Sequence, residues 1–371
     1  MDKMYVEDCC QILDSMRVPI TASDRKEGEY PYYGANGIQD YVADYIFDDE
    51  LVLLAEDGGN FGSKERPIAY RVSGKCWVNN HAHVLKPKEG LDVDYLCYSL
   101  MFYNVDGMVN GATRKKLTQA AMRKMQIPSR SMEEQKFIVD ELNRIIKIKE
   151  QRQQELQLLD NLIKARFVEM FGDPELNPMG WEQVTLNDVC SSIVRGPFGS
   201  ALKKEFFVEP DETTYKVYEQ KHAIQKSASI GTYYITEEKY QELKRFECLP
   251  GDILMSCSGT MGELYQLPDG CEKGVINQAL CKFTLNERIL PICFLVYMKQ
   301  TIGNLETKGS GIQNIAAVSY VKQMPINLPP MDVQNEFEQF VHQVDKSKVA
   351  VQKALDEAQQ LFDSLMQEYF G

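Results

Sequence analysis

Three short stretches of the chain contain residue types that could support catalysis or metal binding. Asn327-Leu-Pro-Pro-Met331 comes close to the Asn/Asp-Pro-Pro-aromatic loop with which amino-methyltransferases hold the amino group of a flipped base. A leucine interrupts the motif, however, and a methionine stands in the aromatic position. Because Pro128 to Met132 occupies the equivalent stretch of an internal repeat, we interpret this stretch as the turn that enters a second long helix.

The other two stretches are Leu51 to Lys64 and the pair His81 and His83. The first resembles a strand followed by a phosphate-binding loop, but its glycine spacing is wrong and no Ser or Thr follows the lysine. Pro67 would also interrupt the helix that such a loop requires. On a strand the two histidines would point the same way, with no Cys or carboxylate partner evident in the sequence. We therefore expect neither a nucleotide site nor a metal site, and no Ser/His/Asp order suggests another active site.

The elements that position these residues occur twice. When Met125 to Gly172 is moved forward by 199 residues without a gap, it lies on Met324 to Gly371, and 12 of the 48 aligned positions are identical. This period is far too long for a solenoid, whose repeats span about 20–50 residues. The sequence therefore predicts two copies of one unit in a single chain, with pseudo-two-fold geometry.

Each copy ends in a predicted long helix, because no Gly or Pro interrupts Met132 to Phe171 or Met331 to Phe370. Apolar residues recur there at alternating spacings of four and three, which is the pattern of a coiled-coil seam. Lys149 and Lys348 occupy the same position of the two seams and should lie where their charge can reach solvent or a partner. The apolar seam residues are Ile138, Leu142, Ile145, Leu156, Leu159 and Ile163 in the first copy, and Phe337, Val341, Val344, Val351, Leu355 and Phe362 in the second.

A helix of about 40 residues, roughly 60 Å long at 1.5 Å per residue, with one apolar stripe needs a partner. The matched seams favour antiparallel pairing of the two helices with each other. The alternatives are that each helix packs on its own globule, or that both pair with another chain.

The stretches before the helices are rich in glycine, aromatic and β-branched residues. Leu51 to Ala55 and Asp252 to Met255 are predicted strands, and Val93 to Tyr103 and Leu290 to Gln300 are predicted short helices. The expected fold is α+β, with two similar mixed globules separated by a long antiparallel two-helix coiled coil. The expected domains are residues 1–128, a first globule; 129–172, a central helical repeat; 173–330, a second globule; and 331–371, a C-terminal helical repeat.

The composition is that of an ordinary globular protein, with 44% hydrophobic and 26% charged residues. No apolar run reaches the roughly 18 residues of a membrane span, and the acidic N-terminus lacks the apolar segment of a signal peptide. Ten scattered cysteines without a CxxC pair are typical of a reducing cytoplasm. The net charge of −13 argues against nucleic-acid binding by bulk charge alone, so any such contact must come from local basic clusters or a basic partner.

Several strings, in this order and in duplicate, make the chain resemble a specificity subunit of a type I restriction–modification system, over nearly its whole length. The resemblance is carried by Asn110-Gly-Ala-Thr-Arg-Lys-Lys-Leu117 and its counterpart Gly309-Ser-Gly-Ile-Gln-Asn-Ile315, by the junction Met170-Phe-Gly-Asp-Pro174, and by Gly196-Pro-Phe-Gly-Ser200 and Gly251-Asp-Ile-Leu254. Tyr30-Pro-Tyr-Tyr-Gly-Ala-Asn-Gly37 and Asn79-Asn-His-Ala-His83 in the first globule fit the same pattern.

The resemblance implies a DNA-reading subunit without catalysis or a cofactor of its own. Each globule is then a target-recognition domain that reads one half of a split, asymmetric target in the major groove of double-stranded DNA. The helices fix the distance between the halves and dock two methyltransferase (modification) subunits that bind S-adenosylmethionine. Two restriction subunits that use ATP and Mg²⁺ can join the complex. The alternative is a scaffold protein of the same fold that assembles partners without reading DNA; an enzyme is the least favoured interpretation.

Side-chain chemistry indicates the candidate DNA contacts, because Arg, Lys, Asn and Gln read base edges, whereas Lys, Arg, Ser and Thr hold phosphates. In the first globule they are Asn36, Asn60, Ser63, Lys64, Asn79, His81, Thr113, Arg114 and Lys115; in the second they are Arg195, Ser200, Lys203, Lys204, Lys221, His222, Ser258, Thr260 and Gln313.

Two of these assignments have structural alternatives. The basic run from Arg114 to Lys116 could instead be the solvated first turn of a helix. The glycines on either side of Pro197-Phe198 suggest a loop tip, where recognition residues concentrate, but Phe198 could be a core residue as readily as an inserted wedge.

Overall fold

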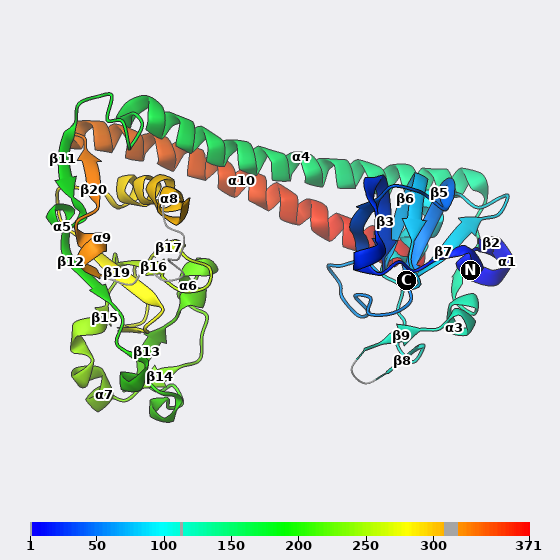
Figure 1. The fold of residues 1–371 in the computed structure, drawn as a ribbon, viewed down its shortest axis with the longest axis horizontal. Coiled ribbons are helices and arrows are strands. Elements are labelled where there is room, and N and C mark those ends of the chain that lie inside the picture. The colour runs from blue at the N-terminus through cyan, green and yellow to red at the C-terminus, as the bar shows by residue number, and fades with distance from the viewer. Residues whose placement is uncertain (1, 112–113, 308–317) are drawn as a thin grey trace. The chain divides into compact units, whose positions relative to one another are not determined.

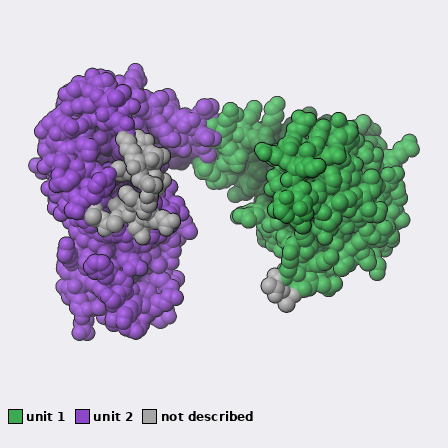
Figure 2. Space-filling model, in the orientation of Figure 1, with its two compact units in different colours: residues 1–154, 351–371 green, residues 155–350 purple. Residues whose placement is uncertain are grey.

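The computed structural model describes residues 2–111, 114–307 and 318–371, and the chain divides into two compact units. Unit 1 comprises residues 1–154 and 351–371, and unit 2 comprises residues 155–350 (Figures 1 and 2). Each of the two long helices contributes one end to unit 1 and the other end to unit 2. The globules fill the rest of each unit.

The described elements of the first half of the chain are β1 (Lys3–Tyr5), α1 (Val6–Cys9), β2 (Cys10–Ile12), η1 (Asp14–Met16), η2 (Ala22–Asp24), β3 (Glu27–Gly34), β4 (Gly37–Val42), β5 (Phe47–Ala55), β6 (Ala69–Val78), β7 (Ala82–Pro87), α2 (Val93–Met101), β8 (Val109–Asn110), β9 (Lys116–Leu117), α3 (Gln119–Arg123), β10 (Gln126–Pro128) and α4 (Met132–Phe171). The main sheet of unit 1 has the order β2-β7-β5-β6-β3-β4, and only the β3–β6 pairing is parallel.

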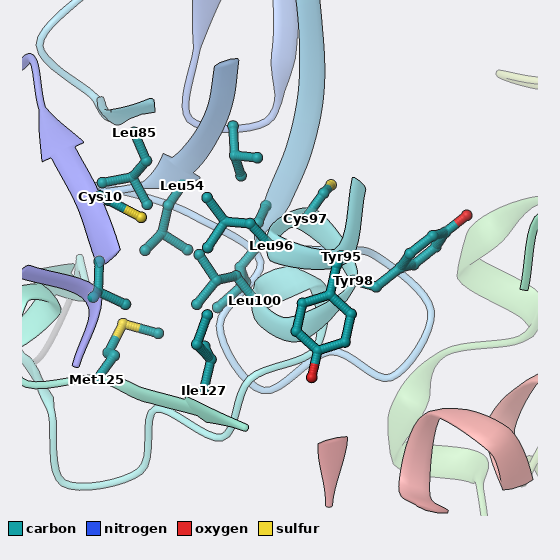
Figure 3. Packing of buried hydrophobic residues seen from close by; sticks show 14 of the residues in the cluster. Cys10, Leu54, Leu85, Tyr95, Leu96, Cys97, Tyr98, Leu100, Met125 and Ile127 are labelled. Atoms are coloured by element: carbon teal, nitrogen blue, oxygen red, sulfur yellow. The ribbon is translucent and has the colours of Figure 1, made fainter. Parts of the chain in front are cut away.

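Strand β5 lies inside this sheet, which explains its continuous apolar sequence. Its side chains alternate between two cores: Val52 and Leu54 pack in one cluster, and Leu51 and Leu53 pack in the other. The larger cluster includes helix α2. Figure 3 shows Leu96 and Leu100 of this helix near Leu54, with Leu85, Met125 and Ile127 in the same core.

The described elements of the second half are β11 (Glu182–Thr185), α5 (Leu186–Val189), β12 (Cys190–Arg195), η3 (Gly199–Ala201), η4 (Lys204–Phe206), β13 (Tyr215–Tyr218), α6 (Gln220–Ile224), β14 (Tyr234–Ile235), α7 (Glu237–Glu242), η5 (Lys244–Phe246), β15 (Glu247–Cys248), β16 (Ile253–Ser256), β17 (Leu264–Gln266), β18 (Gly274–Ile276), β19 (Leu280–Leu285), α8 (Pro291–Thr307), α9 (Val318–Lys322), β20 (Pro325–Leu328) and α10 (Met331–Phe370). Unit 2 has two four-stranded sheets, β12-β19-β16-β17 and β14-β13-β18-β15.

The two globules share one framework. The antiparallel order β2-β7-β5-β6 in unit 1 corresponds, strand for strand in chain order, to β12-β19-β16-β17 in unit 2. In both units a two-stranded ladder, β1–β10 or β11–β20, joins the start of the globule to the strand just before the long helix. The globules differ in what is inserted: β3 and β4 extend the sheet of unit 1, whereas unit 2 carries a separate second sheet.

Both long helices begin and end where the sequence predicts. At the start of α4, Ser131 and Glu134 form a capping box: the Glu134 amide donates to Ser131 Oγ at 3.2 Å and the Ser131 amide to Glu134 Oε2 at 2.9 Å. Gly172 ends the helix at φ +78°, and a Cβ there would come within 2.7 Å of Pro178. Glycine tolerates this left-handed conformation, which other residues adopt at a cost.

The helices pair antiparallel in each unit, so packing of each helix on its globule alone is excluded. In unit 1, Leu142 near the start of α4 shares a core with Phe362 near the end of α10, and Tyr369 Oη donates to Glu141 Oε2 at 2.6 Å. In unit 2, Phe167 near the end of α4 packs on Phe337 near the start of α10, with ring centroids 5.5 Å apart.

The seam residues lie in this contact. Leu156, Leu159 and Leu355 are half-buried, and the other nine apolar seam residues are buried. The two seam lysines contact different partners: Lys149 Nζ lies 4.9 Å from the centroid of the Phe362 ring, and Lys348 Nζ lies 2.6 Å from Asp160 Oδ1. Each charge therefore has a favourable neighbour at the edge of the seam.

Candidate nucleic-acid interface

Four loops of unit 1 meet at the ends of its central strands. We call them the unit 1 loop cluster; it comprises residues 34–37, 56–60, 79–81 and the described part of 110–116. Asn36 Nδ2 donates to the Gly58 carbonyl at 3.1 Å, and the Gly58 amide donates to the Lys115 carbonyl at 3.1 Å. The Glu56 amide donates to the His81 carbonyl at 2.8 Å. These bonds hold segments from four parts of the sequence in one surface.

Arg114, Asp57 and His81 interact on this surface. Arg114 Nε lies 2.7 Å from Asp57 Oδ1, and His81 Nδ1 lies 3.3 Å from Asp57 Oδ2. The Arg114 side chain is 58% exposed despite this ion pair. The alternative of a solvated helix turn for Arg114 to Lys116 is wrong, because Lys116 lies in strand β9 and the next helix, α3, begins only at Gln119.

A buried ionic network lies beneath the unit 1 loop cluster. His83 Nδ1 lies 2.7 Å from Asp14 Oδ2, and its Nε2 lies 2.9 Å from the Leu117 carbonyl. Glu56 Oε2 accepts from Arg17 Nη1 at 2.6 Å, and Glu56 Oε1 lies 3.0 Å from Lys116 Nζ. The network thus joins the segment after β2, the end of β5 and the start of β7 to β9.

The two acids of the network are held in their charged form. Burial alone would raise the pKa of Asp14, but the contact with His83 and the hydrogen bonds from Gln119 and the Val84 amide together outweigh it, so the pKa lies below its ordinary value. Burial opposes the charge of Glu56 too, and the contacts with Arg17, His83 and Lys116 lower the pKa of this carboxyl. A charged acid surrounded by fixed cations orders the segments that supply them.

The expectation that the two histidines point the same way without carboxylate partners is wrong. His81 precedes strand β7 and is half-exposed beside Asp57, whereas His83 lies on β7 and is fully buried beside Asp14 and Glu56. Asp14, Glu56 and His83 are close enough together to hold a metal ion. All four of their carboxylate oxygens, however, already accept hydrogen bonds or ion pairs from protein groups. The geometry is that of an ion-pair network.

The predicted contact residues of the first globule differ in accessibility. Asn36, Lys64, Arg114 and Lys115 are exposed, and Asn60, Ser63 and His81 are half-buried. Asn79 is a correction: it is 3% exposed, its Nδ2 donates to Gln39 Oε1 at 3.0 Å and its Oδ1 accepts from the His81 amide at 2.8 Å. Its amide therefore shapes the loop and is not free to bind a base. Thr113 lies outside the described residues.

Four loops also meet in unit 2, and we call them the unit 2 loop cluster: residues 195–200, 219–222, 257–262 and 277–279. Gln220 Nε2 donates to the carbonyls of Ser258 and Thr260. The Gly196 amide donates to the Leu280 carbonyl at 3.0 Å, and the Asn277 amide donates to the Tyr218 carbonyl at 2.9 Å. Gln220, which joins two of these loops, has no signal in the sequence that distinguishes it from other glutamines.

Most of the predicted contact residues of the second globule lie in or beside this cluster. Ser200, Lys203, Lys204 and Thr260 are exposed, whereas Arg195, Lys221 and Ser258 are half-buried. Lys203 Nζ lies 3.6 Å from Glu205, and Lys221 Nζ lies 2.6 Å from Glu219. Gln313 lies outside the described residues.

His222 is a second correction, because it is fully buried. Its Nδ1 accepts from the Glu219 amide at 2.8 Å and its Nε2 lies 2.7 Å from the Ile230 carbonyl, an arrangement that fits one neutral tautomer. Burial also lowers the pKa of His222. This histidine caps helix α6 and fixes the following loop, and DNA cannot reach it.

The near-match to a methyltransferase loop is structural. Asn327 is 5% exposed within β20, and its Nδ2 donates to the Pro174 carbonyl at 2.7 Å. Pro329 and Pro330 then lead into α10, as the sequence predicts. No described helix is both long and apolar enough to cross a membrane.

Comparison with known proteins identifies the family. A family model described as "Type I restriction modification DNA specificity domain" matches residues 1–158 and 178–358, which is most of the chain. A Haemophilus influenzae protein that is provisionally named a type I restriction enzyme specificity subunit is 28% identical over 347 residues, covering 89% of this chain and 84% of that protein.

Two solved structures share the fold. The first comes from work on complex assembly and conformational transition of the type I restriction–modification system; it has a TM-score of 0.61 at 15% identity and covers 100% of this chain and 97% of its own. The second is a type I restriction–modification S subunit from M. genitalium, with a TM-score of 0.53 at 13% identity, covering 100% of this chain and 96% of its own. With the family model matching both halves, the chain belongs to the type I restriction–modification DNA specificity family.

Proposed function

We propose that residues 1–128 and 173–330 are two target-recognition domains, each of which reads one half of a split, asymmetric DNA target for a type I restriction–modification complex. One observation carries this proposal: the two globules share one strand framework, but each has a different loop cluster. A common framework provides equivalent platforms, and different loops provide different base contacts. Two halves of unrelated sequence can then be read by one chain.

Exposed residues in and beside the loop clusters have the chemistry that the proposal requires. Asn36 and Arg114 can reach base edges, and Lys64, Lys203 and Lys204 can hold phosphates. Lys64 and Lys115 make no ion pair within the described part of the chain. Arg114 and Lys116, by contrast, face Asp57 and Glu56. We therefore assign the phosphate contacts of unit 1 to Lys64 and Lys115 first.

Residues 129–172 and 331–371 form the helical repeats, which we propose set the distance between the half-sites and dock two modification subunits. The support is a pair of equivalent, solvent-exposed leucines outside the seam: Leu162 is 46% exposed and Leu361, its counterpart in the repeat, is 51% exposed. Equivalent apolar positions on the two copies suit two copies of one partner.

The chemistry of the complex belongs to other subunits, because specificity subunits are the non-catalytic members of their systems. We infer that S-adenosylmethionine binds the modification subunits, that ATP and Mg²⁺ act on restriction subunits where these are present, and that the complex works in the cytoplasm. The chain itself supplies DNA recognition and assembly.

Methylome sequencing tests the proposal directly. A host that carries the gene should show one split motif with methylated adenine, and deletion of the gene should remove it. A plasmid copy should restore it, and so should a control copy with Leu176→Ala, an exposed loop residue outside both loop clusters. A methylome that stays unchanged on deletion would favour the scaffold alternative.

A further inference from the structure

Phe198 is the most exposed large apolar side chain among the described residues, at 89% of its accessible surface. The next in order, Leu176 and Val349, are 79% and 71% exposed. Phe198 lies at the tip of the loop between β12 and η3, inside the unit 2 loop cluster. The alternative that it is a core residue is therefore excluded, and its exposure needs another reason.

The loop that carries Phe198 is held firmly from below. The Gly196 amide donates to the Leu280 carbonyl at 3.0 Å, and a Cβ on Gly196 would come within 1.8 Å of the Asn277 carbonyl oxygen. At Gly199 a Cβ would come within 2.7 Å of Gln278 Oε1. Position 196 requires glycine, because the close atoms there belong to the backbone, whereas the end of the Gln278 side chain beside Gly199 can move aside. Pro197, between Gly196 and Phe198, is buried. The aromatic ring is therefore displayed from a fixed base.

The chemistry around the ring favours nucleic acid over an apolar partner surface. Residues 195–204 contain Arg195, Lys203 and Lys204 and no acidic residue, in a chain whose net charge is −13. Glu205 follows and lies 3.6 Å from Lys203 Nζ, so the segment keeps a net positive charge. Lys203 and Lys204 are exposed, and so is Ser200. A segment that combines an exposed apolar ring with cations and a hydroxyl matches the composition of DNA, whose bases are apolar on their faces and whose backbone is anionic.

We propose that Phe198 inserts against the bases of the half-site read by unit 2 and unstacks one base step, while Lys203 and Lys204 hold the flanking phosphates. This inference rests on the proposed DNA recognition and adds a specific residue and action to it. Inserted apolar side chains partly unstack base steps and kink the duplex. Such a residue would also favour half-sites that contain an easily opened pyrimidine–purine step.

Unit 1 provides an internal comparison. The segment after the corresponding strand β2 runs through Arg17-Val-Pro-Ile20, and it carries no aromatic residue. The Ile20 amide donates to Tyr32 Oη at 3.0 Å, so this segment is tied to the globule. The inference therefore predicts unstacking in one half-site only.

The test uses the complex of this chain with its methyltransferase partner and duplex DNA that contains the motif found by methylome sequencing. 2-Aminopurine, whose fluorescence rises when it is unstacked, replaces single bases other than the methylated adenines in either half-site. Wild-type protein should raise the fluorescence at one step of the half-site read by unit 2. Phe198→Ala should abolish that rise and weaken binding about 5- to 150-fold, the range for loss of one stacked base.

Matched variants separate the explanations. Leu176→Ala removes another exposed apolar side chain of unit 2 and should change neither signal, and Phe198→Trp should retain both. A mismatch placed at the affected step should reduce the binding deficit of Phe198→Ala, because the step is already open. Unchanged affinity and fluorescence in Phe198→Ala would overturn the inference, as would loss of the partner subunit from that variant. If the wild-type complex shows no sequence preference, the proposed recognition function itself fails.

Discussion

Asp14 and Glu56 show how single buried residues organise the unit 1 loop cluster from below. Their side chains are 4% and 12% exposed, and they are bound by His83, Arg17 and Lys116. The partners come from segments that are far apart in the sequence, which is why no local motif predicted the network. The same reason explains the wrong assignments of Asn79 and His222: residue type suggested DNA contact, but burial depends on packing that residue type does not encode.

Acid should destabilise unit 1 through these two carboxyls. Their pKa values lie below the ordinary values of 3.8 and 4.5, so their stabilisation is complete above about pH 4.5 and is lost as the pH falls through the lower folded-state values. Asp14→Asn should remove about 3 kcal/mol of stability at neutral pH, since it replaces the nearer of the two buried carboxylates that face His83 Nδ1.

The two tryptophans allow this to be measured for each unit separately, because Trp77 lies in unit 1 and Trp181 in unit 2. In a Trp181→Phe background, urea unfolding followed by the fluorescence of Trp77 should shift on Asp14→Asn. In a Trp77→Phe background the Trp181 transition should not shift. Equal shifts at both tryptophans, or none, would contradict the role assigned to the network.

Lys203 and Lys204 should act through phosphate. The double variant Lys203→Ala with Lys204→Ala should weaken DNA binding by the assembled complex on all sequences. The negative slope of log affinity against log salt should become shallower by roughly 0.9 for each phosphate that the variant no longer neutralises. Titration at several salt concentrations measures this slope. Lys353→Ala, which removes an exposed charge from α10, should leave it unchanged; an unchanged slope in the double variant would rule out the phosphate assignment.

The long helices are the elements that the sequence predicted best. Their apolar spacing is local information, and the absence of Gly and Pro over 40 residues leaves few alternatives to a helix. The sheets were predicted less completely. The single strands β5 and β16 were identified, but β2 pairs with β7 across more than 70 residues and β3 pairs in parallel with β6, and such long-range pairing has no local signature.

Gln135 of α4 and Gln334 of α10 each hydrogen-bond the start of the helix to its globule, in the same way. Gln135 Nε2 donates to the carbonyls of Gly90 and Arg130 at 3.0 and 2.9 Å, and its Oε1 accepts from the Asp92 amide at 2.8 Å. Gln334 repeats these three bonds with Arg288, Pro329 and Leu290. Their identity in the sequence repeat therefore has a structural cause.

Replacing either glutamine with leucine should destabilise its own unit. The change keeps the approximate size but leaves one buried amide and two carbonyls without their partner, at a cost of about 1–3 kcal/mol for each group that stays unsatisfied. Gln135→Leu should lower the unfolding midpoint seen by Trp77, and Gln334→Leu the midpoint seen by Trp181. Gln153→Leu, an exposed position on α4, is the control and should shift neither.

Leu162 and Leu361 occupy equivalent positions on the two long helices. If each docks one modification subunit, Leu162→Glu or Leu361→Glu alone should leave complexes with one modification subunit, and the double variant should leave none. Native mass spectrometry of the copurified complex measures the stoichiometry. Val349→Glu is the matched control, because Val349 is 71% exposed but its counterpart in the repeat is Glu150. Full occupancy in the double variant would place the docking surface elsewhere.

At the scale of the whole molecule, the duplication and the divergence have different roles. The sequence repeat accounts for the antiparallel seam and for the equivalent hydrogen bonds of Gln135 and Gln334, and the common strand framework extends the duplication to the globules. The loop clusters differ between the units, and they hold exposed polar residues to which we assign DNA contacts. Because the net charge of the chain is −13, the attraction to DNA must come from these local groups and from the partner subunits. The sequence predicted two globules, but it could not show which loops meet in each.

The central claim is that each globule reads its own half of the target, and exchanging one globule tests it most directly. Residues 173–330 would be replaced with the corresponding domain of another family member whose methylated motif is known, and the methylome of the host would be sequenced. The account predicts a hybrid motif that keeps one original half-site and the original spacing and acquires the other half-site from the donor. A methylated motif in which both halves change, or neither does, would contradict it.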